Sequence, residues 1–170
     1  MSDNAPKVSV IIPVYNTGYY LRETLNSICT QTLEEQEIIL LNDGSTDGSM
    51  KIIEEYATKD SRIQYHTQPN QGLSVARNQA MKHATGKYIY FMDSDDLLDR
   101  NALQQCYQTC EKDNLDFVFF DAEPILDSAR TENIPDYNRK EQIDENVWKG
   151  IDLLNYELDN QLFRTPVWLC

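Results

Sequence analysis

Short apolar runs alternate with amphipathic segments along the first 120 residues, and this alternation limits the fold more than any other feature of the sequence. The runs are rich in β-branched and aromatic residues, as buried strands are. Each run together with the segment after it takes about 25–30 residues, the span of a βα unit with short connections. The predicted strands are "KVSVIIPV" (7–14), "QEIILLN" (36–42), "RIQYHT" (62–67), "KYIYFM" (87–92) and "DFVFF" (116–120).

The segments between these runs carry apolar residues at the spacing of a helix that buries one face. The predicted buried positions are Leu21, Leu25 and Ile28; Met50, Ile53 and Ala57; Leu73, Ala76 and Ala80; and Leu103, Cys106 and Cys110. Alternating helices and continuously apolar strands predict an α/β protein with an open, mostly parallel, doubly wound sheet. In such a sheet ligands bind outside the carboxyl ends of the strands.

The rest of the chain is less regular. Residues 122–146 are polar without a clear period and are interpreted as a long loop, followed by a helix over 147–159. The length suits a single domain over residues 1–170. The apolar end "TPVWLC" (165–170) reads as the start of another strand, so we expect these residues to be the N-terminal part of a longer protein.

Composition narrows the classes of function. No run approaches the ~20 apolar residues of a membrane-spanning helix. The N-terminus lacks the features of a signal peptide, so a cytoplasmic location is expected. The formal net charge of −13 would repel a nucleic-acid backbone, so nucleic acid is not an expected partner. An anionic ligand would need a metal ion, an arginine or backbone N–H groups to hold it.

The four cysteines are interpreted as buried free thiols. Cys106 and Cys110 are four residues apart on a predicted helix, but no His or Cys partner lies close to them in sequence. The CxxC spacing of zinc sites is missing around these two residues and around Cys29 and Cys170. Free thiols agree with a reducing compartment.

Polar residues follow three of the predicted strands at the point where each strand ends. The first strand leads into "PVYN" (13–16), the second into "NDGSTDGS" (42–49) and the fourth into "DSDD" (93–96). Because the carboxyl ends of parallel strands meet at one edge of a sheet, these groups are expected to converge on one ligand site.

The stretch "NDGSTDGS" has two other interpretations. Asp43, Ser45, Asp47, Gly48 and Glu54 fit a loose calcium-loop template, but a calcium loop follows a helix, and the preceding "QEIILL" is a predicted strand. A plain turn into a helix explains the glycines and a capping Thr46 or Asp47. That turn leaves Asp43 free at the strand end, where it could accept a ligand N–H.

The stretch "DSDD" packs like charges close together, which costs free energy unless a cation offsets it. An acidic helix start explains Asp99, because carboxylates are favourable at a helix N-terminus. It does not explain Asp93 and Asp95, directly at the end of a buried strand. Mn²⁺ or Mg²⁺ takes one or two carboxylates plus phosphate oxygens, so a divalent cation with a diphosphate is favoured.

The stretch "NQGLSVARNQA" (70–80) places Gly72 at a turn and Arg77 beside the apolar face of the helix that follows. An arginine next to a core face needs an anionic partner. A ligand phosphate or an aspartate of the "DSDD" group would serve, and so would a purely structural salt bridge.

Taken together, these residues resemble the inverting family-2 glycosyltransferases of the GT-A fold. "VSVIIPVYN", "NDGSTDGS", "NQGLSVARNQA" and "YFMDSDD" match that family in order and spacing over roughly residues 7–115. The resemblance implies a UDP-sugar donor and an acceptor that is a saccharide or a lipid-linked saccharide. It also implies a role in making polysaccharides or glycoconjugates, with peripheral association of the full-length protein at the inner face of the cell membrane.

The resemblance also assigns residues. Tyr15 would lie near the base and Asp43 would accept the uracil ring N–H. Asp93 would face the ribose and the metal, and Asp95 would coordinate Mn²⁺ or Mg²⁺. The implied nucleotide-binding residues are Pro13, Val14, Tyr15, Asn16, Asp43, Gly72, Arg77, Asp93 and Ser94, and the implied metal ligands are Asp95 and Asp93.

The catalytic base is not among these residues. In the family it follows a Trp-containing strand that "TPVWLC" resembles, so it is expected beyond Cys170, and transfer by residues 1–170 alone is expected to be weak or absent. A non-catalytic nucleotide-sugar-binding module is therefore the main alternative. An aspartyl phosphatase also uses DxD, but usually on the first strand, and a dinucleotide oxidoreductase would need GxGxxG after that strand.

Overall fold

The computed structural model describes residues 5–118, 120 and 122–123. Within them strands and helices alternate as the sequence predicts. In chain order the elements are β1 (Val8–Val14), α1 (Leu21–Cys29), β2 (Gln36–Asp43), α2 (Ser49–Lys59), β3 (Ile63–Gln68), α3 (Leu73–Met81), β4 (Tyr88–Phe91) and α4 (Ala102–Asp113).

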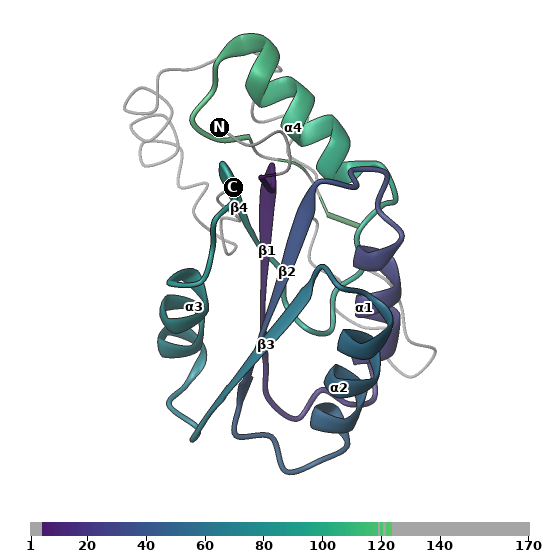
Figure 1. Cartoon of the computed structure of the whole chain (residues 1–170), viewed down its shortest axis with the longest axis vertical. Helices are drawn as coiled ribbons and strands as arrows, with labels where there is room; N and C mark the ends of the chain where they lie inside the picture. Colours follow the sequence, from purple (N-terminus) through teal and green to yellow (C-terminus); the bar gives the residue numbers. More distant parts are fainter. Residues whose placement is uncertain (1–4, 119, 121, 124–170) are drawn as a thin grey trace. The chain divides into compact units, whose positions relative to one another are not determined.

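The four strands form one parallel sheet in the order β3-β2-β1-β4 (Figure 1). The chain moves outward from β1 to β3 and then returns to the other side of β1 to form β4. This reversal creates a switch point between β1 and β4, and in open α/β sheets the crevice at such a point is the usual ligand site. The predicted open, parallel sheet is confirmed.

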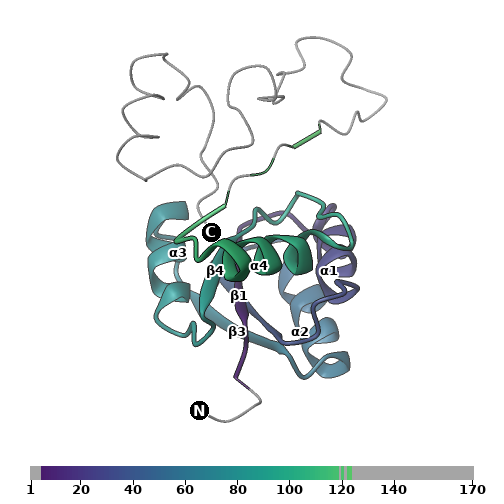
Figure 2. The same cartoon turned by 90° about the horizontal axis from the view of Figure 1, so that it is seen from above.

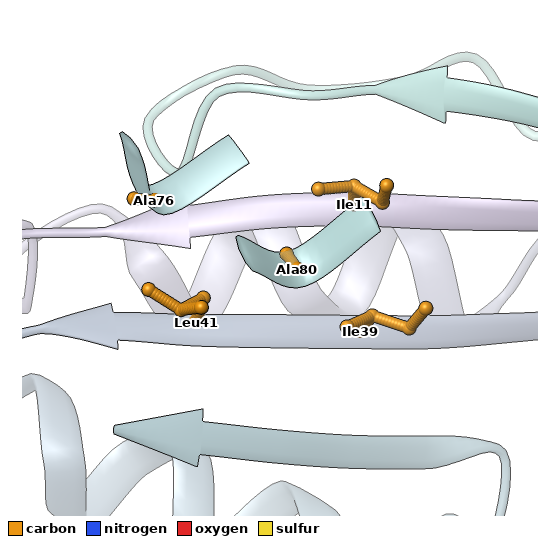
Figure 3. Close-up of a cluster of buried hydrophobic side chains, with 5 residues drawn as sticks. All are labelled: Ile11, Ile39, Leu41, Ala76 and Ala80. Atoms are coloured by element: carbon orange, nitrogen blue, oxygen red, sulfur yellow. The ribbon is translucent and has the colours of Figure 1, made fainter. Parts of the chain in front are cut away.

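Helices cover both faces of the sheet, as in a doubly wound fold. Helices α1 and α2 lie on one face and α3 on the other (Figures 1 and 2). Helix α3 packs on β1 and β2 through a small apolar cluster: Ile11, Ile39, Leu41, Ala76 and Ala80 (Figure 3). Because alanine has a short side chain, α3 can come close to the strands, which brings its first turn over their carboxyl ends.

Three predicted helix faces differ in detail from the structure, and one of them is that of α4, where Cys106 is only partly buried. On α2 the buried apolar positions are Ile52 and Ile53, whereas Met50 and Ala57 are only partly buried. On α3 Leu73 is 50% exposed instead of core-facing. Leu73 is the first residue of its helix, and the buried residues of α3 are Ala76 and Ala80 in the turns that follow.

The prediction of a fifth strand over 116–120 is wrong for the residues that the structure describes. Asp116, Phe117, Val118 and Phe120 do not lie in a strand. Apolar composition favours burial, but a strand also needs a partner with matching hydrogen bonds, and composition cannot supply that partner. Apart from residues 122–123, the predicted loop (122–146), helix (147–159) and final strand (165–170) fall outside the described residues.

The structure describes three of the four cysteines. Cys29, Cys106 and Cys110 are free thiols, of which only Cys110 is fully buried. Burial raises the pKa of the Cys29 and Cys106 thiols to about 11, so both stay protonated and unreactive near neutral pH. Among the described residues, no helix is long and apolar enough to cross a membrane.

The two histidines of the chain stack across β3 and the turn after α3. The rings of His66 and His83 lie 3.6 Å apart between centroids and nearly parallel, at 14°. The Nε2 atom of His66 is buried, without a hydrogen-bond partner in the described part of the chain. Burial first, and then the neighbouring His83, lower the pKa of His66. A charged His66 is therefore unfavourable in the folded state.

We expect this pair to make the protein less stable in mild acid. With a lowered folded pKa, His66 binds more protons when unfolded, so its contribution is present at pH 8 and is lost as pH falls below the unfolded value of about 6.5. The His66→Phe variant keeps a stacked ring that cannot titrate. In urea denaturation, the loss of stability between pH 8 and pH 5.5 should be smaller for His66→Phe than for the parent, and equal losses would contradict the expectation.

Candidate nucleotide-sugar site

A pocket of about 370 Å³ lies at the carboxyl ends of the strands, next to the switch point between β1 and β4. Three strand ends and the start of α3 contribute to it. Its lining residues are Pro13, Val14, Tyr15, Thr17, Asp43, Asn70, Gly72, Leu73, Ala76, Asp93, Ser94 and Asp95. The predicted convergence of the polar strand ends on one place is therefore observed.

Most of the residues singled out from sequence line this pocket, but two do not line it directly. Asn16 has a left-handed backbone (φ 53°), and its side-chain Oδ1 accepts the N–H of Thr46 at 2.8 Å. Its own N–H donates to Ser45 Oγ at 3.1 Å. Asn16 thus ties the loop after β1 to the turn after β2, while Arg77 bonds to Asp93, which lines the pocket.

Asp43 is not free at the end of β2, which corrects the expectation from sequence. It is 2% exposed, and its Oδ1 accepts hydrogen bonds from Gln68 Nε2 at 2.7 Å and the Gln71 N–H at 2.9 Å. Its Oδ2 accepts the Gly72 N–H at 2.9 Å. The parallel register places Gln68 beside Asp43. The carboxylate therefore holds the turn that leads into α3 and lines the pocket at the same time.

Two glycines allow this arrangement. Gly44 has a φ of +73°, and a Cβ there would lie 2.8 Å from the backbone nitrogen of Asn70. Gly72 has a φ of +87°, a conformation that side chains with a Cβ rarely adopt. Gly44 thus lets the turn after β2 approach the turn before α3, and Gly72 supplies the backbone conformation that the second turn needs.

We expect Asp43→Ala to weaken UDP binding by about 10- to 100-fold. The substitution removes a charged acceptor for two backbone N–H groups, each worth roughly 1.5–3 kcal/mol, and so loosens the pocket wall. Isothermal titration calorimetry measures the effect. The control is Asp47→Ala, because Asp47 also bonds turn N–H groups, those of Gly18 and Ser49. Similar UDP affinities for both variants would show that Asp43 has no special part in the pocket.

The calcium interpretation of this turn is not supported. The turn follows strand β2, not a helix. Asp47 Oδ1 accepts the N–H of Ser49 at the start of α2, and Oδ2 accepts the N–H of Gly18, both at 2.9 Å. Asp47 thus holds the N–H of the first residue of α2, but the N-cap position itself is Gly48, so the predicted capping by Thr46 or Asp47 is not observed.

The acidic residues after β4 lie close together beside one arginine. The guanidinium of Arg77 donates to Asp93 Oδ1 at 2.7 Å, so the predicted anionic partner of Arg77 is an aspartate of this group. Burial raises the pKa of Asp93 although Arg77 opposes that effect. Burial and the charges of Asp93 and Asp95 raise the pKa of Asp96 to about 6. The carboxylates thus repel one another, and Arg77 offsets part of that repulsion.

These carboxylates suit a divalent metal that shares its coordination with a phosphate. No cluster of three or more His, Cys, Asp or Glu side chains with metal-binding geometry occurs among the described residues. Mg²⁺ and Mn²⁺ do not need one, because they bind one or two carboxylates and complete their shell with water and substrate phosphate. Asp95 is exposed at the pocket, whereas Asp93 already shares one oxygen with Arg77, so Asp95 is the less committed donor.

Comparison with known proteins agrees with this site. Residues 9–167 match the family described as "Glycosyl transferase family 2". Glycosyltransferase GlyA of Streptococcus pneumoniae is 46% identical over 102 residues, which cover 60% of this chain and 15% of that protein.

Solved structures show the same fold. The chain resembles S. aureus TarS 1-349 in complex with UDP-GlcNAc, with a TM-score of 0.68, 30% identity and coverage of 76% of this chain and 37% of the other. It also resembles the mannosyltransferase PcManGT of Pyrobaculum calidifontis in complex with GDP-Man and Mn²⁺, with a TM-score of 0.58 and 27% identity, covering 62% and 32% of the two chains.

The chain spans less than half the length of the curated relatives it matches, from 15% to 49% among those compared. The match to the family itself, however, extends over nearly the whole chain. With its open parallel sheet of the GT-A type, this chain belongs to glycosyl transferase family 2.

Proposed function

We propose that the chain binds a UDP-sugar together with Mn²⁺ or Mg²⁺, as part of an enzyme that transfers the sugar with inversion to a saccharide or glycoconjugate acceptor. The observation that carries this proposal is the pocket at the switch point. It combines an aromatic side chain, Tyr15, with a turn whose N–H groups bond to the Asp43 carboxylate. It also contains the acidic residues Asp93 and Asp95.

Each part of the pocket has a role in this proposal. Tyr15 is 50% exposed and offers a ring face on which a base can stack. Arg77 orients the Asp93 carboxylate, and Asp95 with Asp93 would hold the metal. A bound metal ion acts as a Lewis acid that stabilises the charge developing on the departing diphosphate. The base that takes the proton of the acceptor hydroxyl is expected beyond Cys170.

Two neighbours support the choice of ligands. The TarS structure contains UDP-GlcNAc, and the PcManGT structure contains GDP-Man with Mn²⁺. The chain matches TarS over more of its length and with a higher TM-score, which favours a uridine nucleotide. A role in polysaccharide synthesis in the cytoplasm, at the inner face of the cell membrane, remains part of the proposal.

Calorimetry with a panel of nucleotides tests the proposal. UDP should bind more tightly in Mn²⁺ than in EDTA, and more tightly than GDP, ADP or NAD under the same conditions. Equal binding of UDP and GDP would refute the uridine assignment, and equal UDP affinity in Mn²⁺ and EDTA would refute the metal. A transfer assay then separates an enzyme from a binding module, with little or no turnover expected for residues 1–170 and turnover expected once downstream sequence is included.

A further inference from the structure

Helix α1 and the turn that follows it carry a row of polar side chains that contact the segment between β4 and α4. We call this row the polar stripe. The stripe consists of Thr24, Ser27 and Gln31, spaced three and four residues apart, and it lies beside the apolar face formed by Leu21, Leu25 and Ile28. Thr24 is 0% and Gln31 5% exposed. Polar side chains at such positions are retained only when they have hydrogen-bond partners.

Every member of the stripe bonds to the backbone around the acidic segment. Thr24 Oγ1 donates to the carbonyl of Ser94 at 3.0 Å, and Ser27 Oγ accepts the N–H of Leu98 at 3.2 Å. Gln31 Nε2 donates to the carbonyl of Asp99 at 2.7 Å.

The attachment continues at both ends of the segment. Gln31 Oε1 accepts the N–H of Leu103 in the first turn of α4 at 3.2 Å. At the pocket side, Thr17 Oγ1 donates to Ser94 Oγ at 2.9 Å. The segment is thus held from the pocket to the start of the next helix.

The segment needs such partners because residues 92–101 belong to no helix or strand. Its backbone groups cannot be satisfied by a regular ladder, and the side chains of α1 take the place of one. The bonded positions, Ser94 and Leu98, lie on either side of Asp95 and Asp96. The attachment therefore fixes the backbone that carries the exposed carboxylate of Asp95.

We infer that Thr24, Ser27 and Gln31 are positioning residues, which hold Asp95 where a metal–diphosphate pair can use it. The inference rests on the proposed function, since it assigns these residues to the metal end of that pocket. Like charges at Asp93, Asp95 and Asp96 repel one another and would spread an unrestrained loop. The stripe opposes that movement before any ligand binds, so less conformational entropy is lost when the ligand binds.

The test compares UDP affinity in Mn²⁺ with UDP affinity in EDTA for each variant of the chain. The ratio of the two affinities isolates the metal contribution, because a general loss of folded protein lowers both values alike. Thr24→Val preserves shape and removes the donor, Gln31→Met removes both functions of the amide, and Thr24→Ser restores a hydroxyl. Thr30→Val is the control, because within the described residues the Thr30 hydroxyl bonds to the carbonyls of Asn26 and Ser27 in the preceding helix and not to the segment after β4.

We expect the ratio to fall by about 10-fold or more in Thr24→Val and Gln31→Met, as it does when groups that orient metal ligands are removed. Thr24→Ser and Thr30→Val should keep the parent ratio. An unchanged ratio in Thr24→Val and Gln31→Met, whatever their melting temperatures, would overturn the inference. If either variant does not fold, Ser27→Ala answers the same question with a smaller change.

The result also separates this inference from the proposed function. A parent chain whose UDP affinity is the same in Mn²⁺ and in EDTA would refute the metal role and the positioning role together. A parent that shows the metal effect, with stripe variants that keep it in full, would refute the positioning role alone.

Discussion

Replacing Asp95 with alanine should lower UDP affinity in Mn²⁺ by about 100-fold or more, to the value that the parent shows in EDTA. Removing groups that only orient metal ligands already costs about 10- to 100-fold in metal affinity, so the loss of a ligand should cost at least as much. Asp95 lies exposed at the pocket, and in the proposed function a bound cation would offset the repulsion between a diphosphate and a chain of net charge −13. Calorimetry in Mn²⁺ and in EDTA gives both values.

The control for Asp95→Ala is Glu54→Ala, which removes an exposed negative charge on α2 away from the pocket. Glu54→Ala should bind UDP like the parent. The melting temperature of Asp95→Ala in EDTA should stay close to that of the parent or rise, because repulsion among the aspartates is relieved. Retention of the full Mn²⁺ effect in Asp95→Ala would exclude Asp95 as a metal ligand.

The second large effect is expected at the amino ends of the strands, away from the pocket, where Glu37 is buried at the start of β2. Only 8% of the residue is exposed. Its Oε1 accepts hydrogen bonds from Ser9 Oγ at 2.6 Å, from the Thr85 N–H at 2.6 Å and from the Gly86 N–H at 3.1 Å. Its Oε2 accepts Gln64 Nε2 at 3.1 Å. One carboxylate thus joins three strands to the turn before β4.

Glu37→Leu should therefore lower the free energy of unfolding by about 3 kcal/mol or more. The leucine fills the space but leaves the Thr85 N–H, the Ser9 hydroxyl and the Gln64 amide without the carboxylate that accepts from them, at a cost of roughly 1–3 kcal/mol for each unsatisfied group. The Gly86 N–H keeps a second acceptor, Ser9 Oγ at 2.8 Å. Urea denaturation followed by circular dichroism measures the change.

Glu35→Leu is the matched control for that measurement, because it removes only a surface ion pair with Lys7. Such pairs contribute about 0–1 kcal/mol. Should Glu37→Leu prove no more destabilising than Glu35→Leu, the buried network would not be a major source of stability.

Local patterns in the sequence were sufficient to predict the fold class and the position of the site at the carboxyl ends of the strands. Apolar runs identify β1 to β4, and apolar residues at helical spacing identify α1 to α4. A buried strand needs a run of apolar residues and a helix needs an apolar face, whichever neighbouring element packs on it. The polar strand ends then had to meet at one edge, since all parallel strands point the same way. For this reason Tyr15, Asp43 and Asp93 could be expected together before any contact was known.

Contacts between segments far apart in the sequence could not be read in this way. Asp43 appears in the sequence as a free carboxylate, but Gln71 and Gly72 satisfy it because α3 packs against β1 and β2 and carries its preceding turn there. Thr24, Ser27 and Gln31 did not stand out, although their three- and four-residue spacing beside an apolar face was a signal that could have been used.

Periodicity and turn residues are local properties, so an α/β chain with polar groups at its strand ends could be predicted from sequence. The strand order could not: the fold places β4 next to β1, so that Asp93, Asp95 and Tyr15 line one pocket. The tertiary structure also decided that Leu73 lines the pocket and that residues 116–118 lie outside the sheet. Contacts between distant segments depend on packing and on hydrogen-bond register, and no single stretch of sequence encodes either of them.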